Sequence, residues 1–239
     1  MMAQVRLYLD QPLGAGQSVT LSREQAHYLF GVMRLGVGDG LAVFDGVTGE
    51  YAATVAVAGK RGGALFLSDQ TRPVQMPPDL WLLFAPIKKE RTDFIVEKAT
   101  EMGARRILPV LTDHTNTARI KWDRLQAHAV EAAEQCGGTF VPEVGELTPL
   151  TRVLADWDTA RRVMFCDETR AGQTATLPDT RGPWAVLIGP EGGFSDAERA
   201  KLSGLDHAHS IALGPRILRA DTAAVAALTF WQTRLGDWG

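Results

Sequence analysis

The sequence predicts an α/β protein in which a small β-rich domain precedes a larger domain with a mostly parallel sheet. Two changes along the 239-residue chain support this division. Short apolar runs separated by glycines fill residues 5–67, whereas apolar strands alternate with helical patterns beyond the proline-rich stretch Thr71–Asp79, which should hold no element. We therefore expect domains at residues 1–72 and 79–239, with a linker at residues 73–78.

The N-terminal domain is expected to contain several short strands and one helix. Leu41–Phe44, Tyr51–Val57 and Ala64–Leu67 are apolar runs with the β-branched and aromatic residues that favour strands. Ser22 followed by Gln25 matches a capping box, in which each side chain accepts a hydrogen bond from the other residue's backbone N–H. A helix should therefore begin after Ser22 and run through the apolar residues that follow it.

Beyond the linker we expect strands and helices in alternation. The expected strands are the apolar runs Leu80–Ala85, Arg105–Leu111, Val163–Cys166, Trp184–Gly189 and His209–Leu213. The expected helices are Thr92–Met102, Trp122–Cys136, a segment with Thr148 as N-cap and Pro149 as first residue, a segment capped by Ser195 with Glu198, and a last helix from Asp221 or Thr222. Gly103 and Gly137 should end the first two helices, because glycine adopts the left-handed conformation common at helix C-termini.

Composition limits the class of protein. With 45% hydrophobic and 22% charged residues, the chain suits folded domains with ordinary cores. Residues 1–11 contain no apolar segment long enough for a signal peptide or a membrane span, so we expect a cytoplasmic location. The net charge of -3 argues against bulk attraction to nucleic acid and favours a local cationic patch instead. Cys136 and Cys166 are too few for a disulfide framework and are expected to be small buried residues.

Two glycine-rich loops follow neighbouring predicted strands. Residues 189–193 read Gly-Pro-Glu-Gly-Gly, and residues 214–220 read Gly-Pro-Arg-Ile-Leu-Arg-Ala. Ligands of open α/β sheets bind beyond the carboxyl ends of the strands, where glycines let backbone amides approach them closely. One such loop could equally be a tight turn without a ligand. Two adjacent loops favour a ligand site, to which the second loop would add apolar walls and arginine side chains.

Other ligand and catalytic motifs are missing from the sequence. There is no Gly-x-x-x-x-Gly-Lys-Ser/Thr phosphate loop and no Gly-x-Ser-x-Gly nucleophile elbow. His207 and His209 could face one side of a strand, but no other His or Cys lies near them in sequence. We therefore expect no metal site.

The two loops lie within a longer pair of motifs. Leu187–Gly193 reads Leu-Ile-Gly-Pro-Glu-Gly-Gly, and Leu213–Ala223 reads Leu-Gly-Pro-Arg-Ile-Leu-Arg-Ala-Asp-Thr-Ala. This pair resembles the motifs of the ribosomal RNA small subunit methyltransferase E family, the uridine N3-methyltransferases of 16S rRNA. The resemblance extends over nearly the whole chain, through Lys88–Gly103, Glu131–Cys136, His27–Arg34, Gly38-Asp39 and Phe44–Gly46.

The resemblance implies a PUA-like β-barrel followed by a SPOUT-class α/β domain whose C-terminal strands and loops form a trefoil knot. It also implies a homodimer that binds S-adenosylmethionine, needs no metal, and acts on ribosomal RNA or on the assembled small ribosomal subunit. Periodicity does not predict the knot, since true knots are nearly absent among folds. The knot is an expectation from the resemblance alone.

The loop positions and the resemblance together give a set of expected site residues. The cofactor is expected to contact Leu187, Ile188, Gly189, Pro190, Glu191, Gly192, Gly193, Leu213, Gly214, Ile217, Leu218, Arg219 and Thr222. RNA contacts are expected from His27, Arg34, Lys88, Arg91 and Lys98.

Arg219 and Glu191 are the candidate catalytic residues. Uracil N3 must lose its proton before it attacks a methyl group, and the fixed guanidinium of Arg219 would stabilise the resulting anion. Glu191 could orient the base, accept its proton or hydrogen-bond loop amides. Asp221, in the same motif, could cap the last helix.

Two residues depart from the family pattern. His114 and Gly138 stand where the family usually carries arginine, which would rearrange or weaken RNA contacts if those arginines touch RNA. Two alternatives therefore stay open. One is a SPOUT methyltransferase acting on another rRNA or tRNA position, and the other is a non-catalytic RNA-binding or ribosome-assembly factor, against which the two intact cofactor loops argue.

Overall fold

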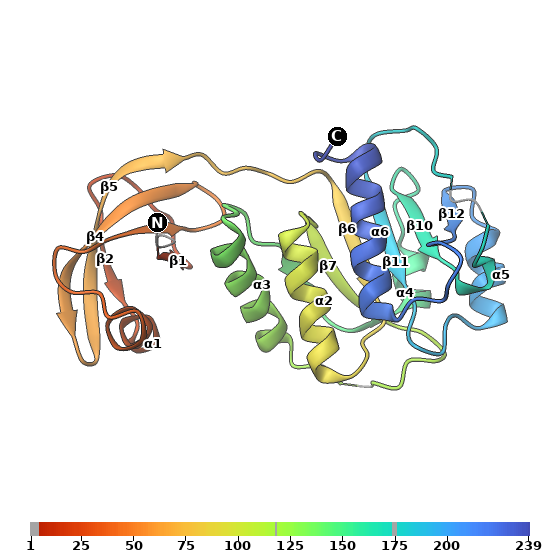
Figure 1. Ribbon diagram of the computed structural model, residues 1–239, viewed down its shortest axis with the longest axis horizontal. Coiled ribbons are helices and arrows are strands. Elements are labelled where there is room, and N and C mark those ends of the chain that lie inside the picture. Colours follow the sequence, from red (N-terminus) through yellow and green to blue (C-terminus); the bar gives the residue numbers. More distant parts are fainter. Residues whose placement is uncertain (1–4, 118, 174–175) are drawn as a thin grey trace. The chain divides into compact units, whose positions relative to one another are not determined.

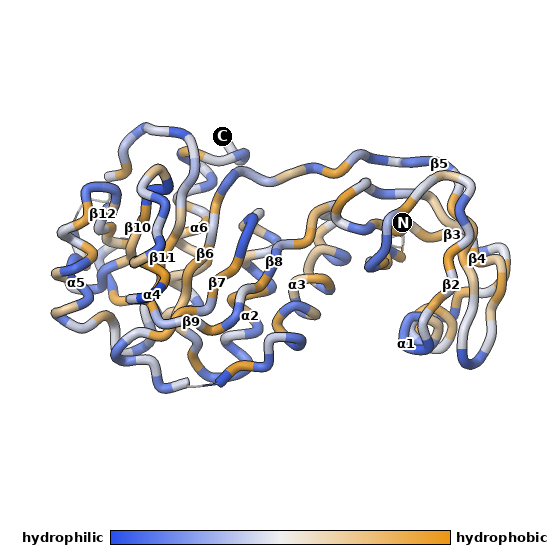
Figure 2. The backbone as a smooth tube through the Cα atoms, turned by 180° about the vertical axis from the view of Figure 1, so that it is seen from behind, coloured by the Kyte–Doolittle hydropathy of each residue, from blue (hydrophilic) through white to orange (hydrophobic). Residues whose placement is uncertain are grey.

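The computed structural model describes residues 5–117, 119–173 and 176–239, and the chain divides into two compact units (Figure 1). The units are Met1–Met76 with Ala133–Val141, and Pro77–Ala132 with Pro142–Gly239. Each unit has its own buried apolar core. Hydrophobic stretches mark the strands of both units in Figure 2.

The first unit is built on a β-sheet, as the apolar runs and glycines predict. Its described strands are β1 (Arg6–Tyr8), β2 (Ser18–Leu21), β3 (Gly40–Phe44), β4 (Glu50–Gly59) and β5 (Gly62–Arg72), in the order β1-β3-β4-β5-β2. Neighbouring strands are antiparallel except β1 and β3. The prediction that Thr71–Asp79 holds no element is wrong at its start, because Thr71 and Arg72 extend β5 and bind Glu50 on β4.

The helix expected after Ser22 is less regular than predicted. Its capping box is confirmed, because Ser22 Oγ accepts from the Gln25 N–H at 3.1 Å and Gln25 Oε1 accepts from the Ser22 N–H at 2.9 Å. After one turn, α1 (Arg23–Ala26) continues as a π-helix, η1 (His27–Val32). The wider turn of a π-helix lets three consecutive residues, Tyr28–Phe30, contact the core of this unit.

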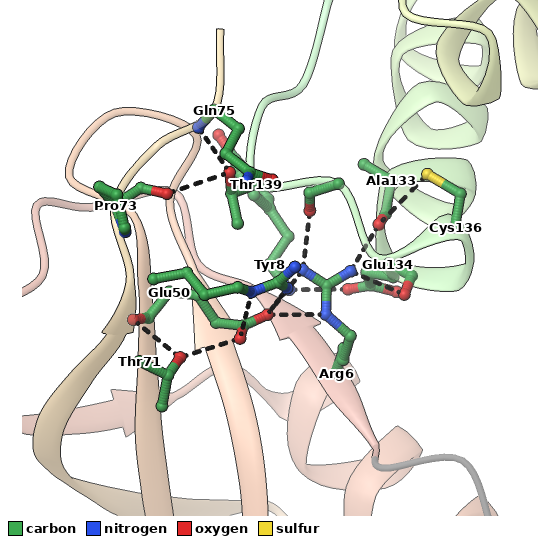
Figure 3. A network of polar contacts seen from close by, with 12 residues as sticks. Arg6, Tyr8, Glu50, Thr71, Pro73, Gln75, Ala133, Glu134, Cys136 and Thr139 are labelled. Atoms are coloured by element: carbon green, nitrogen blue, oxygen red, sulfur yellow. Dashed lines mark hydrogen bonds and ion pairs between the residues drawn. The ribbon is translucent and has the colours of Figure 1, made fainter. Parts of the chain in front are cut away.

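A largely buried polar network ties residues 133–141 to this sheet (Figure 3). Arg6 on β1 donates from Nε to Glu50 Oε2 at 2.9 Å and from its Nη atoms to three carbonyl oxygens of that segment at 2.7 to 2.9 Å. Two of these carbonyls lie in the last turn of α3 (Trp122–Cys136), where a helix leaves carbonyls unpaired and favours a cation. The third belongs to Gly138, one of the two departures from the family pattern.

Glu50 stays ionised at the centre of this network. Burial alone would raise the pKa of Glu50, but hydrogen bonds from Arg72, Thr71 and Arg6 outweigh it and hold the pKa below its ordinary value of 4.5. A carboxylate with a lowered pKa stabilises the folded state above the unfolded pKa and loses that contribution as the pH falls through the folded one. The first unit should therefore weaken below a pH of about 4.5.

Replacing Glu50 with Gln should destabilise the first unit by about 3 kcal/mol at pH 7, because two arginines would then face a neutral amide. All six tryptophans lie in the second unit, so the measurement is hydrogen exchange of the β4 amides in urea rather than fluorescence. Between pH 7 and pH 4 the free energy of unfolding should fall less in Glu50→Gln than in the wild type. The matched control in the second unit is Glu143→Gln, which removes an exposed pair in which the Glu143 side chain is 64% and the Arg106 side chain 36% exposed. Read from hydrogen exchange of the β7 amides, this change should cost under about 1 kcal/mol. Equal losses in both variants would contradict the argument.

The second unit is an α/β layer structure with parallel strands, as predicted. Its described strands are β6 (Leu80–Phe84), β7 (Arg106–Leu111), β8 (Glu143–Val144), β9 (Thr148–Pro149), β10 (Arg162–Cys166), β11 (Trp184–Ile188) and β12 (Ala208–Ile211). They follow the order β12-β10-β11-β6-β7-β8, and β9 also pairs with β7. Every pairing is parallel.

Helices cover this sheet. The described ones are α2 (Lys89–Glu101), α3, α4 (Leu150–Ala155), the short η2 (Glu168–Arg170), α5 (Asp196–Ser203) and α6 (Ala220–Leu235). In Figure 1, α2 and α6 lie side by side in front of the sheet, and Gln232 on α6 donates to the Met102 carbonyl at 2.6 Å. None of the helices in the described ranges is long and apolar enough to cross a membrane. The expectation about residues 1–11 rests partly on residues 1–4, which lie outside the described residues.

Most predicted helix ends are confirmed. Gly103 and Gly137 follow α2 and α3 with φ values of 73° and 80°, and the capping box of Ser195 with Glu198 opens α5. Helix α2, however, begins at Lys89 instead of Thr92.

Three other predictions are wrong. Thr148 does not cap α4, because it pairs with β7 as part of β9 and leaves Pro149 at the N-cap. Asp221 does not cap α6, whose N-cap is Arg219; its carboxylate lies in the first turn, 3.8 Å from Arg91. Cys136 is exposed rather than buried, because it lies at the end of α3.

Candidate functional site

A cleft opens at the carboxyl ends of three neighbouring strands, β10, β11 and β12. Its lining comes from the segments after these strands and from the start of α6: Cys166, Asp167, Glu168, Ala171, Ile188, Gly189, Pro190, Glu191, Gly193, Ile211, Leu213, Gly214, Arg216, Ile217, Leu218, Arg219, Ala220 and Ala223. The space inside it, including the part that opens to solvent, is about 840 Å³. The position is where open α/β sheets bind ligands.

The structure brings most of the expected cofactor residues to this cleft. The ones that line it are Ile188, Gly189, Pro190, Glu191, Gly193, Leu213, Gly214, Ile217, Leu218 and Arg219. Leu187 does not, because it is fully buried within β11. Gly192 and Thr222 also lie outside the lining, and Thr222 is exposed on the first turn of α6.

Within the loop after β11, Gly193 is the residue whose geometry requires glycine. Its φ of 66° is in the left-handed region, and its N–H donates to the Pro190 carbonyl at 2.9 Å. A Cβ atom on Gly193 would lie only 1.9 Å from Glu168 Oε1. Gly192 has no positive φ, and a Cβ there would face His114 at 3.2 Å. Gly193 is thus the position in this loop where a side chain would not fit.

The segment after β10 supplies acidic side chains that the sequence analysis missed. Asp167 and Glu168 line the cleft, and Arg199 on α5 forms ion pairs with both of them. Burial alone would lower the pKa of Arg199, but its hydrogen bonds and ion pairs with Glu168 and Asp167 raise it above the ordinary value. The signal that could have found these carboxylates is their place directly after the predicted strand Val163–Cys166, at the same sheet edge as the two loops.

Cys166 is a poor nucleophile in this cleft. Burial raises the pKa of its thiol to about 12, and the thiolate is the reactive form of cysteine. Covalent chemistry at Cys166 is therefore disfavoured at neutral pH.

The two candidate catalytic side chains are available for a ligand. Glu191 and Arg219 are both exposed and line the cleft. Within the described part of the chain, neither side chain has a hydrogen bond or an ion pair, so the alternative in which Glu191 bonds loop amides gains no support. The Arg219 backbone is held, because its carbonyl accepts from the Ala223 N–H at 2.7 Å as α6 begins.

The expected RNA-binding residues divide between the two units. His27 and Arg34 are exposed in the first unit, and Arg34 is the only described non-glycine residue with a positive φ, 60°. Such backbone strain concentrates at functional sites. Lys88, Arg91 and Lys98 lie on or beside α2 in the second unit. Lys98 pairs with Glu101 at 2.6 Å, whereas Lys88 is exposed.

No cluster of three or more metal-binding side chains occurs among the residues that the structure describes.

Comparison with known proteins decides the family. Residues 74–232 match the RNA methyltransferase domain, and residues 21–65 match the RNA methyltransferase PUA domain. The ribosomal RNA small subunit methyltransferase E of Synechocystis is 32% identical, over 88% of this chain and 71% of its own length. This chain belongs to the ribosomal RNA small subunit methyltransferase E family. The family member of Rickettsia conorii is 28% identical over 96% of this chain and 95% of its own.

Solved structures of similar proteins agree. The small subunit methyltransferase E of Neisseria gonorrhoeae, bound to S-adenosylmethionine, superposes with a TM-score of 0.90 at 26% identity, covering 99% of this chain and all (100%) of that one. A methyltransferase of Legionella pneumophila in complex with the same cofactor gives a TM-score of 0.89 at 26% identity, with 99% and 100% coverage. The expected PUA-like domain and SPOUT-class α/β domain of this methyltransferase E family member are confirmed. The trefoil knot stays a prediction.

Proposed function

We propose that this protein transfers the methyl group of S-adenosylmethionine to N3 of a uridine in 16S ribosomal RNA. The observation that carries the proposal is the cleft after β10, β11 and β12, which both motif loops line, in a chain whose fold matches methyltransferases solved with bound S-adenosylmethionine. We further propose that the protein acts in the cytoplasm as a homodimer with a C-terminal trefoil knot, on free rRNA or the assembled small subunit. These finer points rest on the family resemblance.

The cleft fits the chemistry of S-adenosylmethionine, which combines an adenine, a ribose, a sulfonium and an amino-acid end. Ile188, Ile211, Leu213, Ile217 and Leu218 offer apolar contacts for the adenine. The carboxylates of Asp167, Glu168 and Glu191 suit the cationic groups and the ribose hydroxyls. Gly189 and Gly193 allow close backbone approach.

When bound, S-adenosylmethionine supplies an electrophilic methyl group. The task of the protein is then to hold the uracil with N3 deprotonated and aligned. Arg219 would stabilise the imide anion, because it lines the cleft, its guanidinium stays charged, and it has no competing partner among the described residues. Glu191 would orient the base or accept its proton. The RNA backbone would be held by the exposed or partly exposed cationic side chains named above, His27, Arg34, Lys88, Arg91 and Lys98.

Two measurements test the proposal. Calorimetry should show that the purified protein binds S-adenosylmethionine in a one-to-one ratio per chain. Nucleoside analysis of 16S rRNA from a strain lacking the gene should show loss of N3-methyluridine, restored by the wild-type gene. Loss of a different methylated nucleoside would instead support a SPOUT enzyme with another target, and unchanged nucleosides together with absent cofactor binding would support a non-catalytic factor.

A further inference from the structure

The loop after β7 contacts the glycine-rich loop after β11. His114 Nδ1 lies 3.0 Å from the carbonyl oxygen of Gly192 and 3.2 Å from that of Gly193. The neighbouring Asp113 accepts a 2.5 Å hydrogen bond from the Ser195 hydroxyl at the start of α5. His114 does not line the cleft, so it contacts the cofactor loop from outside.

These distances determine which ring nitrogen of His114 carries hydrogen. Both neighbours of Nδ1 are carbonyl oxygens, which only accept. Nδ1 must therefore be the donor, in one hydrogen bond shared between Gly192 and Gly193.

Glu168, which is ion-paired with Arg199, also lies close to Gly193 in this loop. Glycines lose more conformational freedom on ordering than other residues, and a ligand that must order its own site loses affinity. A loop with glycines at 189, 192 and 193 therefore gains most from contacts that order it before the ligand arrives.

We propose that His114 is a positioning residue for the cofactor: its Nδ1–H holds the carbonyls of Gly192 and Gly193 and so preorganises the loop for S-adenosylmethionine. This inference rests on the proposed function. The proposal also gives a role to His114, which stands where the family usually carries arginine. An arginine guanidinium at this position would offer N–H donors to the same kind of carbonyl acceptor. His114 acts on the cofactor loop rather than only on RNA.

The test compares wild type with His114→Asn, His114→Gln and His114→Ala in the full chain. The amide nitrogen of Asn occupies roughly the place of Nδ1, whereas that of Gln occupies the place of Nε2. Calorimetry should show that Ala and Gln weaken S-adenosylmethionine binding by about three- to tenfold, the equivalent of one net hydrogen bond, while Asn stays within about twofold. Hydrogen exchange of residues 189–194 without cofactor should accelerate in the Ala and Gln variants and not in Asn.

Melting temperatures separate positioning from folding. Because His114 is exposed, all three variants should melt close to the wild type. Equal cofactor affinity in all four proteins, or equal loss in Asn and Ala, would overturn the inference. A wild-type protein that does not bind S-adenosylmethionine would refute the proposed function, whereas the exchange rates would still decide whether His114 orders the loop.

Discussion

Replacing Gly193 with alanine is expected to weaken S-adenosylmethionine binding by at least about tenfold. The φ of 66° places this residue in the left-handed region, where a side chain costs roughly 1–2 kcal/mol. The free loop of the variant would relax out of this conformation and the cofactor would have to restore it, so this strain lowers affinity by about tenfold. The new Cβ would also lie 1.9 Å from Glu168 Oε1, so either Glu168 or the loop must move. Calorimetry with S-adenosylmethionine measures the loss.

Gly192→Ala is the matched control within the same loop. Gly192 has no positive φ, and its Cβ would meet the His114 Cβ at 3.2 Å, which requires a shift of a few tenths of an ångström. Its effect on affinity should therefore stay below about threefold. The double variant Gly193→Ala with Glu168→Ala removes the clash but keeps the backbone strain. It should therefore still bind S-adenosylmethionine at least about tenfold more weakly than the wild type. Wild-type affinity in Gly193→Ala would mean that the shape of the loop is irrelevant to the cleft.

Local sequence rules predicted the parts of the cleft that are continuous in the chain. The loop after β11 and its capping box at Ser195 involve residues only a few positions apart, and apolar runs identify the strands on either side. Asp167 and Glu168 escaped prediction because β10 lies between β11 and β12 in the sheet, although β10 comes first in the chain. Their position directly after a predicted strand indicates the correct edge of the sheet, but sequence order does not give strand order, so only the fold shows that they lie beside the two loops.

Tertiary contacts also overrode local preferences elsewhere. Thr148 and Pro149 have the residue types of a helix start, but pairing with Val110 and Leu111 makes them a strand. Similarly, periodicity predicts that α3 belongs with the second domain throughout, whereas Arg6 binds its last carbonyls from the first unit's sheet. Contacts between residues more than 100 positions apart leave no local pattern in the sequence.

Replacing Arg219 is expected to reduce methyl transfer far more than cofactor binding. Arg219 lines the cleft with an exposed side chain on a backbone that is held at the start of α6, so its guanidinium is available to a uracil in the cleft. If it stabilises the anion as the methyl group arrives, Arg219→Ala and Arg219→Lys should both lower turnover by about a hundredfold or more, the usual loss for deleting one such donor. Lys retains the charge but lacks the planar fork. Single-turnover methylation of 16S rRNA, with calorimetry for the cofactor, separates the two effects.

Arg216→Ala is the control that distinguishes a catalytic arginine from a general positive charge. Arg216 is exposed, lies in the same loop and lines the same cleft. The Arg216→Ala variant therefore removes one positive charge from the same cleft. If the field of the cleft were decisive, both alanine variants would lose turnover alike, and added salt would narrow their difference from wild type. If Arg219 acts through a directed contact, Arg216→Ala should stay within about tenfold of wild type, and S-adenosylmethionine affinity should change by less than about threefold in every Arg219 variant. Affinity that falls in proportion to rate would make Arg219 a clamp for the cofactor, and wild-type rates in both Arg219 variants would remove it from the site.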